Sequence, residues 1–316
     1  MKILDWNKLN DKDKKKLTGS RKLAFVAGPV QMSDKRVREL ISELSECQLL
    51  FGCLKDEWIP GLEGFLQFSP LKIEELNKPK SRPIEKPAIL SHFQKDLKYI
   101  IRELKPKVVV FINGSWFQQI HYRKEFWEAV SVGAKIELKS PFVNEAEAKR
   151  FTKKIEENYE AEKLYSKTKK YSDREIFQIL EKKRRHSWDW CGQPTAALVR
   201  NGRILALTHN RVMSYQAYQM HDGSIREKFQ VPAQEMIETH LTNHAEVEML
   251  EVARRERIRL ENTSLYMNIF PCPVCAKMLA RTPIRKVVYA QDHNLGNTIG
   301  YKVLEASGVK LKRVVV

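Results

Sequence analysis

Two short motifs, far apart in the sequence, constrain most strongly how this chain can fold. The first is His244-Ala245-Glu246, and the second is Pro271-Cys272-Pro273-Val274-Cys275. One imidazole and two thiolates suit a zinc ion, and three protein ligands leave a fourth position open for water. Glu246 stands too close to His244 to bind the same ion easily, but it can reach a water on the metal and move protons. The fold therefore has to bring both segments to one point.

A plainer interpretation of these residues stays open. His244 can be a core histidine, and the two cysteines can form a redox pair or one half of a zinc ribbon. A ribbon needs a second cysteine pair, and the chain has none at useful spacing. The remaining cysteines are scattered, at Cys47, Cys53 and Cys191. The upstream histidine and the prolines on both sides of Cys272 favour the zinc site.

Length and charge limit the class of protein. A chain of 316 residues with 42% hydrophobic residues suffices for two domains with real cores. Its net charge of +17 favours anionic partners such as nucleotides or nucleic acid, unless the basic residues only form a solvated surface. Five cysteines make no disulfide framework, and no apolar run is long enough for a membrane span. These features predict a cytoplasmic protein that makes no membrane contact.

Strand and helix alternate through the first half, which predicts a parallel sheet covered by helices. Strands are predicted at 22–27, 48–54, 108–112 and 134–138. Helices are predicted at 34–46 and 92–104, from the turn at 113–115 to about 132, and at 144–159. Asp34 and Asn144 are expected to cap two of these helices. Residues 55–90 contain five prolines and are predicted to be an irregular surface excursion. The phosphate-binding glycine motifs are absent after the first strand.

The second half predicts another α/β domain. Its expected elements are helix 173–186, strands 195–199 and 203–208, a helix from His244, strand 264–269, a helix from Cys272, strand 286–290, helix 301–307 and strand 309–316. Asn201-Gly202 is a strong signal for the hairpin turn. Both motifs then begin helices, where free backbone N–H groups favour a thiolate. Two helices lying side by side on a sheet could hold one ion.

Changes in composition predict four segments. Residues 1–20 form a basic N-terminal segment, 21–159 a Rossmann-like α/β domain, 160–172 a charged linker, and 173–316 the domain that carries both motifs. The basic run 182–186 ends a helix, where cations suit the helix dipole or could equally meet phosphates. The role of 21–159 stays open between assembly, regulation and a grip on nucleic acid.

Residues 173–316 resemble the deoxycytidylate (dCMP) deaminase family of the cytidine deaminase superfamily. The H-x-E and P-C-x-x-C motifs are the signature of zinc-dependent nucleobase deaminases. Further resemblance lies in segments 270–277 and 284–289, and in Asp292-His293, Gly300-Tyr301 and Leu304-Glu305. The resemblance implies a three-layer α/β/α fold, and also an enzyme that works as an oligomer.

The resemblance further implies how the site would work. Zinc on His244, Cys272 and Cys275 would activate water, Glu246 would move the protons, and dCMP would become dUMP with release of ammonia. Groups near Ala245 and Pro271 would hold the base. Asn210 would hold the sugar, and the phosphate candidates are Arg211, Arg226 and Lys228. The chain departs from the family at Glu248, where Asn is common, and in a connection 211–243 without the usual Gly-x-Pro.

Other functions stay open beside this one. A deaminase could act on cytosine or adenine in single-stranded DNA or in RNA, including tRNA, with the basic N-terminal half binding the nucleic acid. Residues 187–316 hold 17 Lys and Arg against 12 Asp and Glu, so +12 of the +17 lies in residues 1–186. Aromatic residues within 116–127 could stack on bases. A degenerate, binding-only domain is a third possibility, and His221 with His240 could form a second zinc site.

Overall fold

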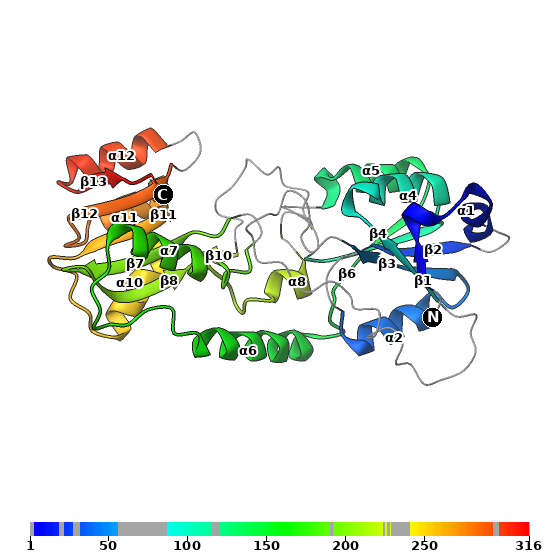
Figure 1. The fold of residues 1–316 in the computed structure, drawn as a ribbon, viewed down its shortest axis with the longest axis horizontal. Coiled ribbons are helices and arrows are strands. Elements are labelled where there is room, and N and C mark those ends of the chain that lie inside the picture. The colour runs from blue at the N-terminus through cyan, green and yellow to red at the C-terminus, as the bar shows by residue number, and fades with distance from the viewer. Residues whose placement is uncertain are drawn as a thin grey trace. The chain divides into compact units, whose positions relative to one another are not determined.

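The computed structural model describes residues 3–18, 22–27, 32–55, 87–114, 120–189, 192–223, 225, 228, 241–292 and 297–315. The chain forms two compact units (Figure 1). Unit 1 comprises Met1–Phe151 and Ala217–His240, and unit 2 comprises Thr152–Gln216 and Leu241–Val316. A segment from the second half of the sequence therefore folds with the first half. The four predicted segment limits stay a prediction beside this division.

A six-stranded sheet forms the centre of unit 1, and all of its pairings are parallel. Its strands are β1 (Ile3–Asp5), β2 (Leu23–Ala27), β3 (Gln48–Leu54), β4 (Ala88–His92), β5 (Val108–Ile112) and β6 (Lys135–Lys139). The spatial order is β1-β4-β3-β2-β5-β6. The five strands from β4 to β6 follow the doubly wound order. The predicted parallel α/β domain is confirmed.

Helices cover both faces of this sheet (Figure 1). The helical elements of unit 1 are η1 (Trp6–Lys8), α1 (Asp11–Leu17), α2 (Asp34–Glu43), η2 (Gln94–Asp96), α4 (Leu97–Leu104), η3 (Ile120–Tyr122), α5 (Lys124–Ser131) and α8 (Tyr218–Asp222). α6 (Glu145–Ala161) runs from unit 1 into unit 2. Apolar residues of α1, α4 and α5 share one core with β2, β3, β4 and β5. Burial of this shared apolar surface holds the layers together.

Two local expectations in unit 1 differ from the structure. Ser33, not Asp34, caps α2, because its hydroxyl accepts the Arg36 N–H at 3.1 Å. The predicted helix 92–104 begins later, because β4 occupies Ala88–His92 as a buried strand beside β3. The basic N-terminal segment contains β1 and α1. Trp6, which directly follows β1, and Leu17, the last residue of α1, are buried in the core of unit 1.

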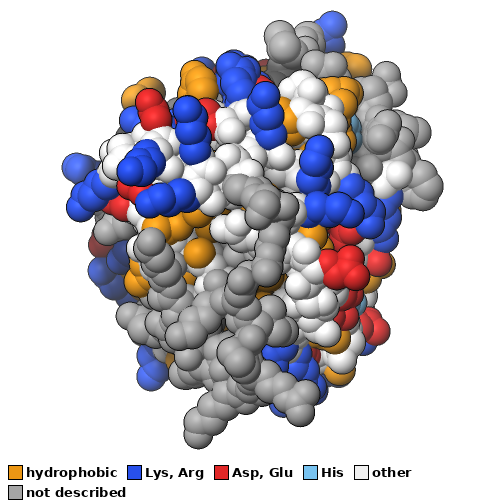
Figure 2. All heavy atoms as spheres, turned by 90° about the vertical axis from the view of Figure 1, so that its right-hand side faces the viewer, with side chains coloured by type: hydrophobic (Ala, Val, Ile, Leu, Met, Phe, Trp, Pro, Cys, Tyr) orange, Lys and Arg blue, Asp and Glu red, His pale blue; other side chains and the backbone are white. Residues whose placement is uncertain are grey.

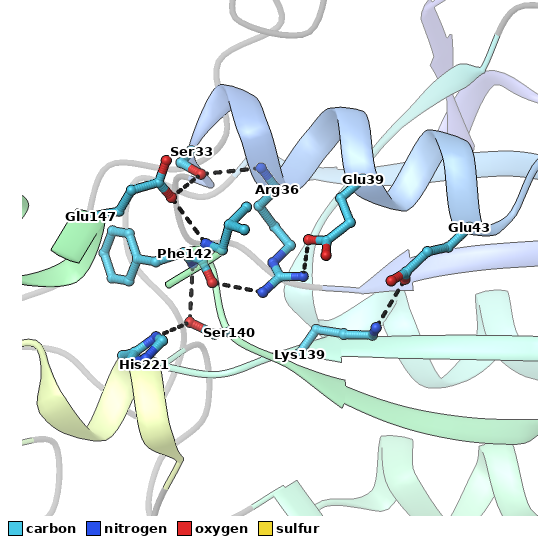
Figure 3. A network of polar contacts seen from close by, with 10 residues as sticks. Ser33, Arg36, Glu39, Glu43, Lys139, Ser140, Phe142, Glu147 and His221 are labelled. Carbon is cyan, nitrogen blue, oxygen red and sulfur yellow. Dashed lines mark hydrogen bonds and ion pairs between the residues drawn. The ribbon is translucent and has the colours of Figure 1, made fainter. Parts of the chain in front are cut away.

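A polar network fixes the connections at one edge of the unit 1 sheet (Figure 3). Ser33 donates to Glu147 at 2.9 Å, and Arg36 donates to the Phe142 carbonyl at 2.7 Å. The Ser140 hydroxyl accepts the Phe142 N–H at 3.0 Å and lies 3.1 Å from Nδ1 of His221. The start of α2, the β6–α6 connection and α8 therefore meet within unit 1.

Unit 2 contains a mixed five-stranded sheet with the order β13-β12-β11-β7-β8. Its strands are β7 (Thr195–Arg200), β8 (Arg203–His209), β11 (Ser264–Ile269), β12 (Lys286–Gln291) and β13 (Lys310–Arg313). β11, β12 and β13 are parallel, whereas β7 pairs antiparallel with both β11 and β8. Asn201 and Gly202 have φ of 49° and 76°, as the predicted hairpin turn requires.

Helices form a layer on each face of this sheet. α7 (Asp173–Arg184) packs on one face, and α10 (Ala245–Arg255), α11 (Pro273–Leu279) and α12 (Asn297–Ala306) contribute to the core on the other. This is the predicted three-layer α/β/α arrangement. A short antiparallel pair, β9 (Arg211–Val212) with β10 (Thr242–Asn243), lies beside it. No helix of the described residues combines the length and apolarity that crossing a membrane requires.

Candidate active site

The two motifs occupy the N-terminal ends of α10 and α11. His244 is the residue before α10, directly after β10, and Cys272 is the residue before α11, shortly after β11. The Cys272 sulfur accepts the Cys275 N–H at 3.5 Å, so the thiol itself caps the helix. Pro273 suits the first helical position because it has no N–H to leave unpaired. Two helix starts thus bring the three candidate ligands together.

The geometry of these three side chains suits a zinc ion. Nδ1 of His244 lies 3.5 Å from the Cys272 sulfur and 3.4 Å from the Cys275 sulfur. All three ligand atoms lie within 4.8 Å of one another. Zinc–sulfur bonds of about 2.3 Å and zinc–nitrogen bonds of about 2.0–2.1 Å at a tetrahedral angle separate S and N by about 3.5 Å. Both cysteines are free thiols, so they are available as ligands.

The environment also favours a thiolate. Hydrogen bonding from Cys275, followed by that from His244, lowers the pKa of Cys272, whereas the same hydrogen bond with Cys272 and burial raise the pKa of Cys275. The contact with Cys272 raises the pKa of His244, and the charges of Glu246 and Asp189 add to this effect. Negative charge is therefore stabilised on the sulfur that caps α11, as metal binding through sulfur requires.

Glu246 lies in the first turn of α10 and is only 3% exposed. Burial raises the pKa of its carboxyl to about 7, and the carboxyl forms a hydrogen bond with Cys275. A carboxyl group with a pKa near neutrality can both accept and donate a proton at physiological pH. The structure thus places a buried carboxyl group, with a pKa near neutrality, beside the His/Cys/Cys group.

The predicted sugar ligand lies across a strand pair from the histidine. β9 and β10 pair Arg211 with Asn243, and continuing this antiparallel register by one residue sets Asn210 opposite His244. Asn210 is 2% exposed. Its Nδ2 donates to the Gly192 carbonyl at 2.9 Å and to Oδ2 of Asp189 at 3.3 Å. Its Oδ1 has no hydrogen-bond partner within the described part of the chain.

The remaining predicted substrate contacts are Ala245, Pro271 and Arg211. Ala245 is fully buried at the start of α10, and its carbonyl accepts the Thr208 hydroxyl at 2.9 Å. Pro271 is buried directly before Cys272. Arg211 flanks Asn210 but is paired with Glu156 at 2.9 Å. Each of these residues is the sequence neighbour of a candidate site residue: Ala245 follows His244, Pro271 precedes Cys272, and Arg211 follows Asn210.

Lys228 belongs to unit 1, where it pairs with Asp222 at 2.6 Å, and Arg226 lies outside the described residues. Glu248, the departure from the family pattern, accepts the side-chain N–H of Asn243 at 3.0 Å. His221 contacts Ser140, and His240 lies outside the described residues. Within the described ranges, no second group of His, Cys, Asp and Glu meets the spacing of a metal site.

Sequence reasoning missed Asp189 and Thr208. Asp189 is 4% exposed and contacts Asn210, and Thr208 ties the end of β8 to the start of α10. Asp189 belongs to an irregular stretch with no motif of its own, so only the fold shows where it lies. Thr208 sits at the predicted end of a strand, but a lone threonine there is too common to be a signal.

Part of the chain matches a known protein family. Residues 170–291 match the family model described as the cytidine and deoxycytidylate deaminase zinc-binding region. The matched segment contains both motifs, Asn210 and Asp189. The resemblance predicted for the C-terminal half is thereby confirmed.

Similar individual proteins include deoxycytidylate deaminases. The enzyme of Enterobacteria phage T2 is 30% identical over 71 residues, which are 22% of this chain and 38% of the relative. The enzyme of Saccharomyces cerevisiae is 32% identical over 77 residues, 24% of each chain. The chain thus spans well under half the length of these relatives. A dCMP deaminase from cyanophage S-TIM5, solved with dCMP and dUMP, is 24% identical with a TM-score of 0.29; the match covers 38% of this chain and 80% of that one.

Proposed function

We propose that the chain is a zinc-dependent deaminase that converts dCMP to dUMP and releases ammonia. The observation that carries this proposal is the contact of a buried, proton-carrying Glu246 with a His/Cys/Cys group of zinc-like spacing. The deoxycytidylate deaminases among the similar proteins support a cytosine nucleotide as the substrate.

The residues of the chain have distinct roles in this reaction. The chemistry that zinc on His244, Cys272 and Cys275 would supply is Lewis acidity, which lowers the pKa of water toward neutrality. Glu246 accepts a proton from that water while the oxygen adds to C4 of the ring. The carboxyl delivers this proton to N3, then accepts the second proton from the hydroxyl now on C4 and delivers it to the amine, so that the C4–N bond breaks, ammonia leaves and uracil remains. Because Glu246 is buried, its proton is exchanged with the substrate rather than with bulk water.

Ammonia release tests the proposal directly. Purified zinc-loaded protein is offered dCMP, dCTP, deoxycytidine, cytidine and adenosine side by side, and Glu246→Gln serves as the blank. We expect turnover of dCMP and a loss of at least a hundredfold in the variant, as for removal of a general acid–base group. Zinc content of both proteins is measured in parallel. Full turnover by a zinc-loaded Glu246→Gln protein would contradict the mechanism.

A second candidate function is deamination of a base within a polynucleotide, and one surface of unit 1 favours it. Trp127 on α5 is 59% exposed and Tyr99 on α4 is 50% exposed. The Lys98 ammonium lies 5.1 Å and the Arg102 guanidinium 6.0 Å from the Tyr99 ring centre. Figure 2 shows many Lys and Arg side chains on one face of the molecule. Exposed rings beside cations are the usual platform for single-stranded nucleic acid.

Binding of a labelled single-stranded oligonucleotide tests this second candidate. If unit 1 binds nucleic acid, Trp127→Ala weakens binding by about tenfold, as loss of one stacking partner does. Added salt weakens it steeply, because phosphate contacts release counterions. Val130→Ala, which truncates another exposed residue of α5, is the matched control and leaves affinity nearly unchanged. Equal affinities of the wild-type, Trp127→Ala and Val130→Ala proteins for the oligonucleotide would contradict this second candidate function.

A further inference from the structure

A buried histidine just after α7 takes no part in the proposed reaction. His186 is 2% exposed, and its backbone N–H donates to the Lys183 carbonyl at 3.0 Å. The Tyr159 ring stacks on the imidazole, with 4.1 Å between the ring centres and 14° between the planes. The His209 ring meets it edge-on at 6.0 Å, and Gln216 donates to the His186 carbonyl at 3.2 Å. These contacts hold the imidazole in one place and one orientation.

Both ring nitrogens of His186 have polar partners. Nε2 lies 3.2 Å from a carboxylate oxygen of Glu162, and Nδ1 lies 3.0 Å from Nζ of Lys183. A carboxylate only accepts hydrogen bonds, so Nε2 carries the hydrogen and Nδ1 presents a lone pair to the lysine. All three side chains belong to unit 2 and form a row of carboxylate, imidazole and amine. A nucleophile, a base and a group that orients the base follow one another in this way in covalent catalysis.

The surroundings also change the titration of this amine. Burial lowers the pKa of Lys183 to about 8, against the opposing charges of Glu162 and Glu160. The charge of Arg211 adds to the fall. Burial, followed by the charge of Lys183, lowers the pKa of His186, so its imidazole is neutral at physiological pH and keeps its lone pair. Lys183 itself is only half-buried, which leaves the amine open to a reagent from solution.

We infer that Lys183 is a nucleophilic lysine that takes an acyl group from an anionic acyl donor, with His186 as the base and Glu162 as the residue that positions the base. In this step Nζ of Lys183 forms a bond with the acyl carbon, and the bond from that carbon to the leaving oxygen or sulfur breaks. The proton lost by Nζ passes to Nδ1 of His186 and then to the leaving group. The product is an uncharged amide, which replaces a cation that is costly to bury.

Positive charge around Lys183 favours a donor that carries phosphate. The lysine lies within the basic run 182–186 at the end of α7, in which Lys182 and Arg185 are exposed. Lys and Arg side chains form strong, charge-assisted hydrogen bonds with phosphate oxygens. Acyl phosphates and the acyl thioesters of a phosphate-bearing carrier share this chemistry, an acyl group on an anionic leaving group. The basic run would therefore hold the donor while the amine attacks it.

Acetylation without any other enzyme tests the inference, with acetyl phosphate and acetyl-coenzyme A as separate probes. Mass spectrometry of proteolytic fragments measures the rate at each lysine. At about pH 7.5 we expect Lys183 to react about tenfold faster than Lys182, its exposed neighbour on α7, because more of its amine is free. The rate at Lys183 should level off above about pH 8, where ordinary lysines still gain free amine. Reaction with one probe alone identifies the donor, and equal rates at both lysines with both probes would overturn the inference.

Two variants test the residues beside the amine. In His186→Asn, the amide oxygen can replace Nδ1 as a hydrogen-bond acceptor but takes no proton, so the rate at Lys183 should fall at least about tenfold. Glu162→Gln keeps the shape of the side chain and frees the imidazole to adopt the other tautomer. Its maximal rate should fall several-fold, while the pH of half-maximal rate moves down, because a carboxylate that favours the ammonium form is gone. A merely structural role of Glu162 would not move that pH.

Glu181→Gln is the matched control, because it makes the same change of charge on α7. Glu181 pairs with Arg184 at 3.2 Å, and its loss should leave the rate at Lys183 unchanged. The Glu162 side chain is 54% exposed, so Glu162→Gln should fold even where His186→Asn does not, and circular dichroism checks both. An unchanged maximal rate in Glu162→Gln, or an equal fall in Glu181→Gln, would overturn the inference. The acetylation requires neither zinc nor deamination, so its outcome is independent of the proposed function.

Discussion

At the scale of single residues, the candidate site contains titratable side chains whose charged forms are costly to bury. Glu246 is the clearest example, because burial, with a smaller contribution from the charge of Cys272, raises the pKa of its carboxyl to about 7. An acid with a raised pKa stabilises the folded state only while it is protonated. Its contribution is complete below the unfolded pKa and is lost as the pH rises through the folded value.

This linkage predicts a pH dependence of stability for the metal-free protein. Between pH 4.5 and about 7, the contribution of Glu246 to the free energy of unfolding should fall by up to about 3 kcal/mol, given about 1.4 kcal/mol for each pKa unit. Urea unfolding of wild type and Glu246→Gln at several pH values measures it. The difference between the two proteins should grow with pH, since Gln cannot ionise. A constant difference would show that the carboxyl is not buried as described.

At the scale of secondary-structure elements, the hairpin β7–β8 supports Asn210 from one side. Its turn needs a left-handed residue at Gly202, whose φ is 76°. The hairpin leads directly through His209 to Asn210, so its register fixes where the amide stands. A turn that specifies register therefore also specifies the position of the predicted sugar contact.

Gly202→Ala is expected to lower the free energy of unfolding by about 1 kcal/mol, because alanine pays for the left-handed conformation. Gly192→Ala is a suitable control, since the φ of Gly192 lies outside that region and an added Cβ would meet, among the described residues, only Pro194, at 3.9 Å. Chemical denaturation of both variants measures the difference. Equal losses in the two proteins would mean that the turn conformation does not limit stability.

Local signals predicted some elements fully and others not at all. β3, β5 and β11 have the predicted bounds, since each is a short apolar run between turn residues. β4 was missed because Pro87 precedes it in a stretch rich in prolines, and its pairing with β3 decides its structure. The candidate ligands could be named from the sequence because H-x-E and P-C-x-x-C are local spacings. Asp189 could not be predicted, because its proximity to Asn210 is a tertiary contact that no local pattern indicates.

At the scale of the whole molecule, the chain forms two compact units, and each has its own hydrophobic core. The stability of one unit can therefore change without an equal change in the other. If His244, Cys272 and Cys275 hold zinc, the ion ties the starts of α10 and α11 within unit 2. Binding to the native state alone stabilises the part of the fold that contains the ligands. Unit 1 contains none of these ligands and has its own parallel sheet.

Chelation of the metal is therefore expected to act on one unit. Amide hydrogen exchange should speed up at least tenfold at the starts of α10 and α11, and change little in β2, β3 and β5. Mass spectrometry of exchanged fragments, before and after treatment with a chelator, measures both. Re-addition of zinc should restore protection. Uniform loss of protection in both units would show that they unfold as one.

The division of the chain also bears on how such a protein can change over evolution. The segment Ala217–His240 leaves unit 2 after β9 and returns at β10, and these two strands are paired with each other at its base. A segment whose two ends are held by a pair of strands can be lengthened at a small entropic cost, since closure depends only weakly on length. Insertions here would leave Asn210 and His244 in place. The β9–β10 pair therefore marks a position in the chain where additional sequence can be inserted while the candidate site keeps its structure.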